Sequence, residues 1–270
     1  MDKIVSYYNQ FDEWGRLDRE PLEFRINLHH ILECLPGKGQ VLDNGAGPGK
    51  YAMALAEMGY RVTLTDLTPR LVEIAERKAE ELKLRDRFDG FHACDARELR
   101  RFADGQFDAS LMLGPLYHLQ AAEDRDKAAR ELYRVTKPDG FVFVAFMPRV
   151  KFLSTSLMFP ENWKPNHTVD GLAEFMRTGM FNHSNEGRFT GAYYYPIEEI
   201  KPFMESHGFK TVKMIGSGSV AGAMKDEHWA YWRGRGEAEF KQVMDLILKE
   251  SDNPYNLGAS THLLYIGRKA

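Results

Sequence analysis

The sequence predicts an α/β fold in which helices cover both faces of a sheet of seven, mostly parallel strands. Short runs of apolar and β-branched residues alternate with segments of helical periodicity along most of the chain. Glycine and proline separate these segments at intervals typical of strand–helix–strand units. Because such units place their strands side by side in one direction, the pattern predicts a parallel sheet.

Four strands are predicted in the first half of the chain, from runs rich in β-branched and apolar residues. They cover residues 41–43, 61–66, 88–93 and 107–113. The first helix, Tyr51–Met58, has helical periodicity and stops at Gly59, a common helix terminator. The second helix starts at Thr68-Pro69, an N-cap followed by proline at the first helical position, and runs to Leu84.

The second half repeats the alternation. An amphipathic helix, Glu123–Val135, precedes Pro138-Asp139-Gly140, which indicates a turn. The continuous apolar run Phe141–Phe146 is typical of a strand buried on both faces. The remaining predicted elements are helices at 197–207 and 237–250 and strands at 210–215 and 261–269.

Two segments do not fit the repeat. Residues 1–36 mix aromatic and charged residues and predict a helical N-terminal cap. Residues 148–196 show only a short helix at 169–177 and predict an insertion, since long loops in compact domains are usually lids or binding elements. The core is therefore expected to comprise residues 37–147 and 197–270 of a single domain.

Composition narrows the function classes. Of 270 residues, 43% are hydrophobic and 28% charged, as in ordinary globular proteins, and the net charge of -3 argues against a nucleic-acid binder held by bulk positive charge. Two cysteines, Cys34 and Cys94, cannot build a disulfide framework or a four-thiolate zinc site. Without a secretory signal or a spanning apolar run, we expect a cytoplasmic protein with no membrane partner.

The strongest local signal is the glycine cluster after the first strand, Asp43-Asn44-Gly45-Ala46-Gly47-Pro48-Gly49. A phosphate-binding P-loop needs a longer spacing and a Ser or Thr where this chain has Tyr51. A dinucleotide fingerprint needs a third glycine where this chain has Lys50, although Asp66 stands at a suitable distance for a ribose-binding acid. An NAD-dependent oxidoreductase therefore remains an alternative.

The order of motifs resembles the class I S-adenosylmethionine-dependent methyltransferases of the small-molecule type, over about residues 41–269. The matching segments are the glycine cluster, Asp66 after the second strand, Cys94-Asp95-Ala96, Phe107-Asp108 through Leu119, and Leu132 through Gly140. This resemblance implies a Rossmann-like fold and transfer of a methyl group from S-adenosylmethionine, which leaves S-adenosylhomocysteine. A cofactor-binding module without catalysis is a second alternative.

The resemblance also implies the cofactor-binding residues. They are Asp43, Gly45, Ala46, Gly47, Gly49, Asp66, Leu67, Asp95, Ala96 and Leu113. Asp66 is expected to accept the ribose hydroxyls, and Asp95 to lie near the adenine amino group, unless it caps a helix over residues 96–101. Because the cofactor has a carboxylate, a cation is also expected, for which we predict Arg25.

Methyl transfer is an in-line displacement at a sulfonium, for which alignment is the enzyme's main contribution. Tyr117 and His118, which follow the fourth strand, are predicted to be catalytic, and Tyr8, Tyr193 and Tyr195 to contact the acceptor. Leu113-Gly114-Pro115-Leu116-Tyr117 departs from the motif of nucleobase-amine methylases. We therefore expect a small-molecule or peptide acceptor, methylated on nitrogen or oxygen.

No metal site is predicted. His29 and His30 are adjacent, and neighbouring positions of a helix are expected to point in different directions.

Overall fold

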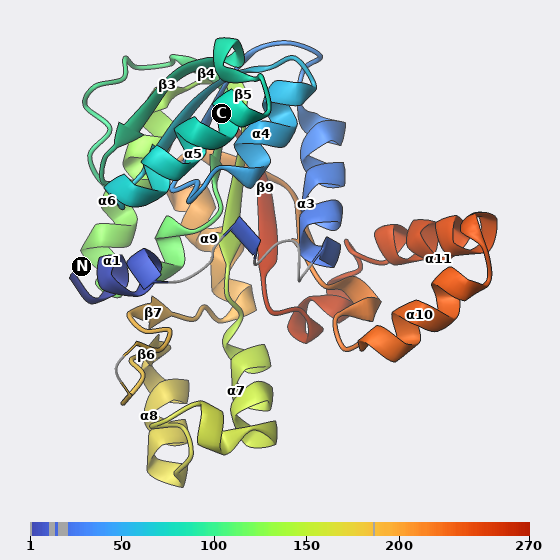
Figure 1. Cartoon of the computed structure of the whole chain (residues 1–270). Coiled ribbons are helices and arrows are strands. Elements are labelled where there is room, and N and C mark those ends of the chain that lie inside the picture. The colour runs from blue at the N-terminus through green and yellow to red at the C-terminus, as the bar shows by residue number, and fades with distance from the viewer. Residues whose placement is uncertain (1, 11–13, 16–20, 186) are drawn as a thin grey trace.

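The computed structural model describes residues 2–10, 14–15, 21–185 and 187–270 and forms a seven-stranded sheet with helices packed on both faces (Figure 1). The strand order is β3-β2-β1-β4-β5-β9-β8. The strands are β1 (Gln40–Asn44), β2 (Arg61–Asp66), β3 (Phe88–Ala93), β4 (Phe107–Met112), β5 (Thr136–Phe146), β8 (Phe209–Gly216) and β9 (Leu263–Lys269). The predicted fold class is confirmed.

Only β9 runs antiparallel to its neighbours β5 and β8, whereas the other pairs are parallel. The carboxyl ends of six strands therefore meet at one edge of the sheet, and β9 begins at that same edge. In open α/β sheets this edge is where ligands bind.

Alternate side chains of the strands build two apolar layers. Along β5, Val142 and Val144 pack with α6 and α9, whereas Phe143 packs on the opposite face with α3, α4 and α5. The helices of the core are α3 (Pro21–Cys34), α4 (Lys50–Glu57), α5 (Pro69–Glu81), α6 (Ala122–Val135), α9 (Ile197–Ser206) and α11 (Glu237–Lys249). The predicted helices of the sheet region agree with α4, α5, α6, α9 and α11 to within a few residues.

One predicted turn lies inside a strand. Pro138-Asp139-Gly140 forms a bulge in β5, where the pairing with β4 passes from Phe107↔Thr136 to Ala109↔Phe141. Asp139 adopts a φ of 61° there. These three residues therefore do bend the backbone, but they do so inside β5, which begins five residues earlier than the predicted strand.

Two segments overhang the carboxyl edge of the sheet. At the N-terminus lies α1 (Asp2–Gln10), which supplies residues to the cavity described below. The second segment contains α7 (Arg149–Met158), α8 (Val169–Thr178) and a hairpin of β6 (Met180–Phe181) and β7 (Ala192–Tyr193), and extends away from the sheet (Figure 1). Its own aromatic core comprises Phe152, Phe175, Phe181 and Tyr194.

A helical hairpin between β8 and β9 was not fully predicted. α10 (Asp226–Gly234) packs with α11 and projects to the side of the sheet (Figure 1). α10 has no buried residue, so it needs no apolar stripe facing the core, and such a stripe is the sequence pattern from which helices are predicted. Among the helices of the described residues, none is long and apolar enough to cross a membrane.

Candidate functional site

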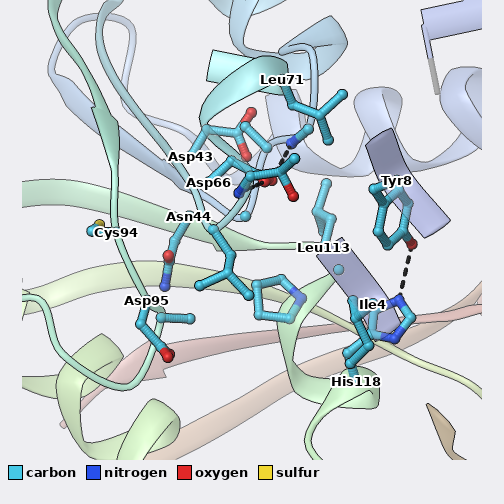
Figure 2. A pocket seen from close by; sticks show the side chains of 18 of the residues that line it. Ile4, Tyr8, Asp43, Asn44, Asp66, Leu71, Cys94, Asp95, Leu113 and His118 are labelled. Atoms are coloured by element: carbon cyan, nitrogen blue, oxygen red, sulfur yellow. Dashed lines mark hydrogen bonds between the residues drawn. The ribbon is translucent and has the colours of Figure 1, made fainter. Parts of the chain in front are cut away.

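A cavity opens at the carboxyl edge, beneath α1 and between the ends of β1, β2, β3 and β4 (Figure 2). We call it the glycine-loop cavity. Nine of the sequence-predicted residues line it, namely Asp43, Gly45, Ala46, Gly47, Asp66, Leu67, Asp95, Ala96 and Leu113. The predicted Tyr8, Tyr117 and His118 line it as well. The topology therefore gathers at one place residues that are more than 100 positions apart in the chain.

The glycine loop turns in a conformation that other residues rarely adopt. Gly45, Gly47 and Gly49 have φ values of 73°, 57° and 85°. A Cβ on Gly45 would overlap the Pro115 ring, and a Cβ on Gly49 would lie 2.7 Å from Leu64 Cδ1. Glycine is thus required at 45 for the approach to the β4 loop and at 49 for packing on β2.

Asp43 carries a buried carboxylate at the end of β1. It is 1% exposed, and its Oδ2 has no hydrogen-bond partner among the described residues. The pKa of Asp43 is raised to about 7. Burial is the main cause and nearby Asp66 adds to it, whereas a backbone hydrogen bond from Ala52 acts to lower the pKa. A ligand that brings a cation or a hydrogen-bond donor would satisfy this oxygen.

Asp66, at the end of β2, holds the loop together. Its Oδ2 accepts a hydrogen bond from Gly47 N at 2.8 Å, and its Oδ1 accepts one from Thr68 N at 2.8 Å. Burial raises the pKa of Asp66 despite these bonds. Since each carboxylate oxygen has a second lone pair, Asp66 can accept two further hydroxyl hydrogen bonds.

Asp95 lies in the cavity wall but is already paired. The Arg97 guanidinium binds both carboxylate oxygens, with Nη2 2.6 Å from Oδ2, and also reaches Asp124 at 2.6 Å. Arg97 N donates to Asp95 Oδ1 at 2.9 Å. Residues 96–101 form turns, so the alternative of a helix capped by Asp95 is wrong.

Tyr117 and His118 follow β4 in a short 3-10 helix, Pro115–His118. The Tyr8 hydroxyl of α1 hydrogen-bonds His118 Nε2 at 2.9 Å across the cavity (Figure 2). The pKa of His118 is lowered to about 4, mainly because the ring is buried and to a smaller extent because His262 lies nearby. His118 is therefore neutral at pH 7 and a weak proton acceptor.

A second cavity, of about 330 Å³, adjoins the first between α1, α7 and the loop before β9. We call it the aromatic cavity, because seven of its wall residues are Tyr, Phe or Trp: Tyr7, Tyr8, Tyr117, Phe152, Trp163, Phe189 and Tyr194. Tyr8 and Tyr117 line both cavities. Its size and apolar walls are typical of small-molecule sites.

Four predicted site residues line neither cavity: Gly49, Arg25, Tyr193 and Tyr195. Arg25 is exposed on α3, on the side opposite the buried Ile26 and Asn27, and lines neither cavity. Tyr193 stacks on Arg125 at 3.7 Å, and Tyr195 is buried in the core, so neither side chain lines either cavity. The intervening Tyr194 does line the aromatic cavity.

For the three tyrosines, the reason is the two-residue period of extended chain, which sends successive side chains to opposite faces; Arg25 instead lies on the exposed side of α3. The predictions for Arg25, Tyr193 and Tyr195 are therefore wrong about which side chains face the site. Sequence reasoning also missed Lys50, which lines the glycine-loop cavity at the start of α4.

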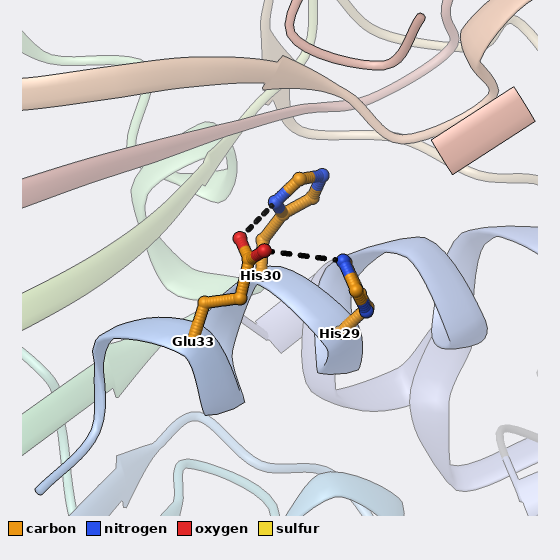
Figure 3. A group of neighbouring side chains, drawn as sticks. All are labelled: His29, His30 and Glu33. Atoms are coloured by element: carbon orange, nitrogen blue, oxygen red, sulfur yellow. Dashed lines mark hydrogen bonds and ion pairs between the residues drawn. The ribbon is translucent and has the colours of Figure 1, made fainter. Parts of the chain in front are cut away.

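The described residues contain one group of three potential metal ligands, His29, His30 and Glu33 (Figure 3). The two histidines were expected to point in different directions, but both reach Glu33. His29 lies four positions before Glu33 on α3 and 3.3 Å from its carboxylate, and His30 lies three positions before it and 3.0 Å away. The Lys213 ammonium lies 2.8 Å from Glu33 and 2.9 Å from His30 Nδ1. An ammonium thus already neutralises this group, which we interpret as an ion-pair network.

The raised pKa of Asp43 predicts a pH-dependent stability. The ordinary pKa of 3.8 applies to the unfolded chain, so between about pH 4 and 7 the folded chain holds a proton that the unfolded chain has lost. The free energy of unfolding should therefore fall as pH rises through this window, by up to about 4 kcal/mol. Urea unfolding of the wild type and of Asp43→Asn, at about pH 5 and pH 8, measures the effect.

Asn cannot ionise, so the difference between the two proteins isolates Asp43 from the neighbouring Asp66. Equal slopes of stability against pH in the wild type and in Asp43→Asn would show that Asp43 is ionised in the folded chain throughout.

Comparison with known proteins identifies the family of this site. The model of a methyltransferase domain matches residues 42–144, which span β1 to β5 and include the glycine loop. The protein named methyltransferase YqeM of Bacillus subtilis is 27% identical over 229 residues, 77% of this chain and 83% of YqeM. A glycine/sarcosine N-methyltransferase of Parasynechococcus marenigrum is 35% identical over 143 residues, and the chain spans only 50% of that enzyme.

The same fold occurs in a solved 1,6-didemethyltoxoflavin-N1-methyltransferase of Burkholderia thailandensis. The TM-score is 0.55 at 20% identity, covering 100% of this chain and 86% of that one, which holds 1,6-didemethyltoxoflavin and S-adenosylhomocysteine. The residues here fit S-adenosylmethionine, since the unpartnered Asp43 oxygen can take its ammonium and Asp66 its ribose hydroxyls. The matched domain is that of a methyltransferase and not that of an NAD-dependent oxidoreductase. The matched domain and these relatives together support an S-adenosylmethionine-dependent methyltransferase.

Proposed function

We propose that this enzyme methylates a small molecule held in the aromatic cavity, using S-adenosylmethionine held in the glycine-loop cavity. The observation that carries the proposal is the common wall, Tyr8 and Tyr117, between the two cavities. Tyr117 follows β4, at the centre of the sheet, where the ends of β1 and β4 converge. A donor and an acceptor on either side of this wall would lie next to each other.

On the donor side, Asp66 would accept the ribose hydroxyls and Asp43 the ammonium, while Lys50 would pair with the carboxylate. Leu67, Ala96 and Leu113 are apolar wall residues for the adenine and the methionine chain. Asp95 would accept a hydrogen bond from the adenine amino group while its oxygens remain paired with Arg97. Because Arg97 holds the Asp95 carboxylate in place, Arg97 is a positioning residue. The bound cofactor supplies an electrophilic methyl group.

On the acceptor side, the chain excludes water and aligns the acceptor with that methyl group. Holding two reactants in a reactive geometry lowers a barrier by about 7–11 kcal/mol. A cavity of about 330 Å³ between α1 and the 148–196 insertion favours a small, flat acceptor over an extended peptide. An acceptor nitrogen or oxygen would attack the methyl carbon.

The experiment is a screen for transfer of radiolabelled methyl groups from S-adenosylmethionine to aromatic and aliphatic metabolites and short peptides. With an acceptor found, Tyr117→Phe and His118→Ala are expected to lower acceptor affinity and turnover at least about 10-fold, because both rings shape the shared wall. His228→Ala, an exposed histidine of α10, is the matched control. Unchanged turnover and acceptor affinity in both site variants would refute the proposed acceptor position.

A further inference from the structure

A glutamate–histidine pair borders the aromatic cavity and has no part in the cofactor site. His262, in the loop before β9, places its Nδ1 2.9 Å from Glu23 Oε2, in the first turn of α3. Both side chains are largely buried, at 19% and 13% exposure. His262 lines the aromatic cavity, and its ring centroid lies 5.6 Å from that of Tyr117, the residue shared by both cavities.

The pair determines which ring nitrogen carries the proton. An ionised carboxylate only accepts hydrogen bonds, so Glu23 requires the proton of a neutral His262 to reside on Nδ1. Nε2 is then the proton-accepting atom. The backbone of His262 is also held, because its carbonyl accepts a hydrogen bond from Ser217 N at 3.0 Å. A carboxylate behind a histidine fixes the ring and stabilises the imidazolium that forms when the ring accepts a proton.

The charges around the cavity indicate what the acceptor is. Among the described residues that line the aromatic cavity there is no Asp or Glu, and one lysine, Lys151. A nearby cation favours an anionic ligand and repels an ammonium. Moreover, a neutral amine is nucleophilic as it stands, whereas a hydroxyl gains nucleophilicity when it loses its proton.

Resting on the function proposed above, we propose that His262, oriented by Glu23, is the general base of the reaction and that the acceptor is an aromatic hydroxyl compound. His262 Nε2 takes the hydroxyl proton, and the acceptor oxygen forms a bond to the methyl carbon. The carbon–sulfur bond breaks with its electron pair left on sulfur, so the products are an aryl methyl ether and S-adenosylhomocysteine. The proton on His262 then passes to water. The seven aromatic residues of the walls provide faces on which the acceptor ring packs.

Other titratable groups face His262. They are Tyr7 and Tyr8 from α1, Tyr117 from the β4 loop and Lys151 from α7, with His118 behind the shared wall. Burial lowers the pKa of His118, so that ring is neutral at pH 7. His262 is the histidine of this set that has a carboxylate behind it, and it acts as a base only while its Nε2 carries no proton. Protonating it removes the base, so activity should fall on the acid side of the pH profile.

The test uses para-nitrophenol as the probe, because its phenolate has a distinct visible absorption band. With wild-type protein, S-adenosylhomocysteine and a pH below the pKa of the free phenol, we expect binding to increase the phenolate band. His262→Ala should lose this increase while S-adenosylhomocysteine affinity stays unchanged. Methylation of para-nitrophenol, or of an acceptor found in the screen, should fall at least about 100-fold.

Glu23→Gln keeps the size of the side chain and should lower turnover about 10-fold, with a shift of the acid limb to lower pH, because the imidazolium loses its carboxylate. His207→Ala is the matched control, since His207 forms a histidine–carboxylate pair with Asp126 outside both cavities. Thermal unfolding confirms that each variant folds.

A phenolate band and a turnover in His262→Ala equal to those of the wild type would refute the dyad and leave the proposed methyl transfer standing. Robust methylation of amines without methylation of any phenol by the wild type would refute the acceptor class. No methyl transfer to any compound, together with a His262-dependent phenolate band, would refute the proposed function but not the proton-accepting role of His262.

Discussion

Replacing Asp66 by alanine is expected to weaken the binding of S-adenosylhomocysteine at least about 100-fold, as measured by titration calorimetry. Two hydrogen bonds to a carboxylate contribute about 3–6 kcal/mol together, and 1.4 kcal/mol corresponds to a tenfold change in affinity. The same substitution removes the bonds that Asp66 accepts from Gly47 N and Thr68 N, so the glycine loop also loses its anchor on β2. Both effects act in the same direction.

Asp104→Ala serves as the control for Asp66→Ala. Asp104 is also a carboxylate, but its side chain is 82% exposed, pairs with Arg134 and does not line the glycine-loop cavity. We expect its effect on cofactor affinity to be negligible. Near-normal affinity in a folded Asp66→Ala protein would contradict the assignment of the ribose to Asp66.

Gly45→Ala is expected to destabilise the chain by about 2–5 kcal/mol and to abolish cofactor binding. A left-handed conformation costs a non-glycine residue about 1–2 kcal/mol, and overpacking costs about 1–3 kcal/mol more. At this position φ is 73°, and the added Cβ would overlap the Pro115 ring. Relief of that overlap must move the β4 loop, which carries Tyr117. Urea unfolding and calorimetry measure the two effects.

Gly37→Ala is the matched control, because Gly37 has no atom within 4 Å of an added Cβ and its φ is not positive. Its expected change in stability lies within about 0.5 kcal/mol. If Gly45→Ala were as stable as Gly37→Ala and bound S-adenosylhomocysteine normally, the close approach of the glycine loop to Pro115 would not exist in solution.

Local sequence patterns sufficed for most of the fold. The strands of the sheet are apolar runs, and their helices have clear periodicity with glycine or proline at the ends, so short-range rules determine them. α10 was missed because it buries no residue, and α7 because it buries only Phe152 and Ser156. The start of β5 was missed because Pro138-Asp139-Gly140 also forms bulges. These failures arise where tertiary context decides between conformations that local sequence permits.

The cofactor side of the site was predictable for a related reason. Its residues follow β1, β2, β3 and β4 directly, and parallel strands bring such positions together. The acceptor side depends on contacts between distant segments. Tyr194 faces the cavity while Tyr193 and Tyr195 do not, and His262 reaches it because β9 is antiparallel and begins at the carboxyl edge. Neither fact follows from spacing alone.

A crystal structure with bound S-adenosylhomocysteine would show directly how the cofactor lies in the glycine-loop cavity. We expect a ribose on Asp66, an amino group on Asp43 and a sulfur that faces Tyr117 and, beyond it, the aromatic cavity. A sulfur that points away from this cavity, or a ligand bound outside the glycine loop, would contradict this expectation.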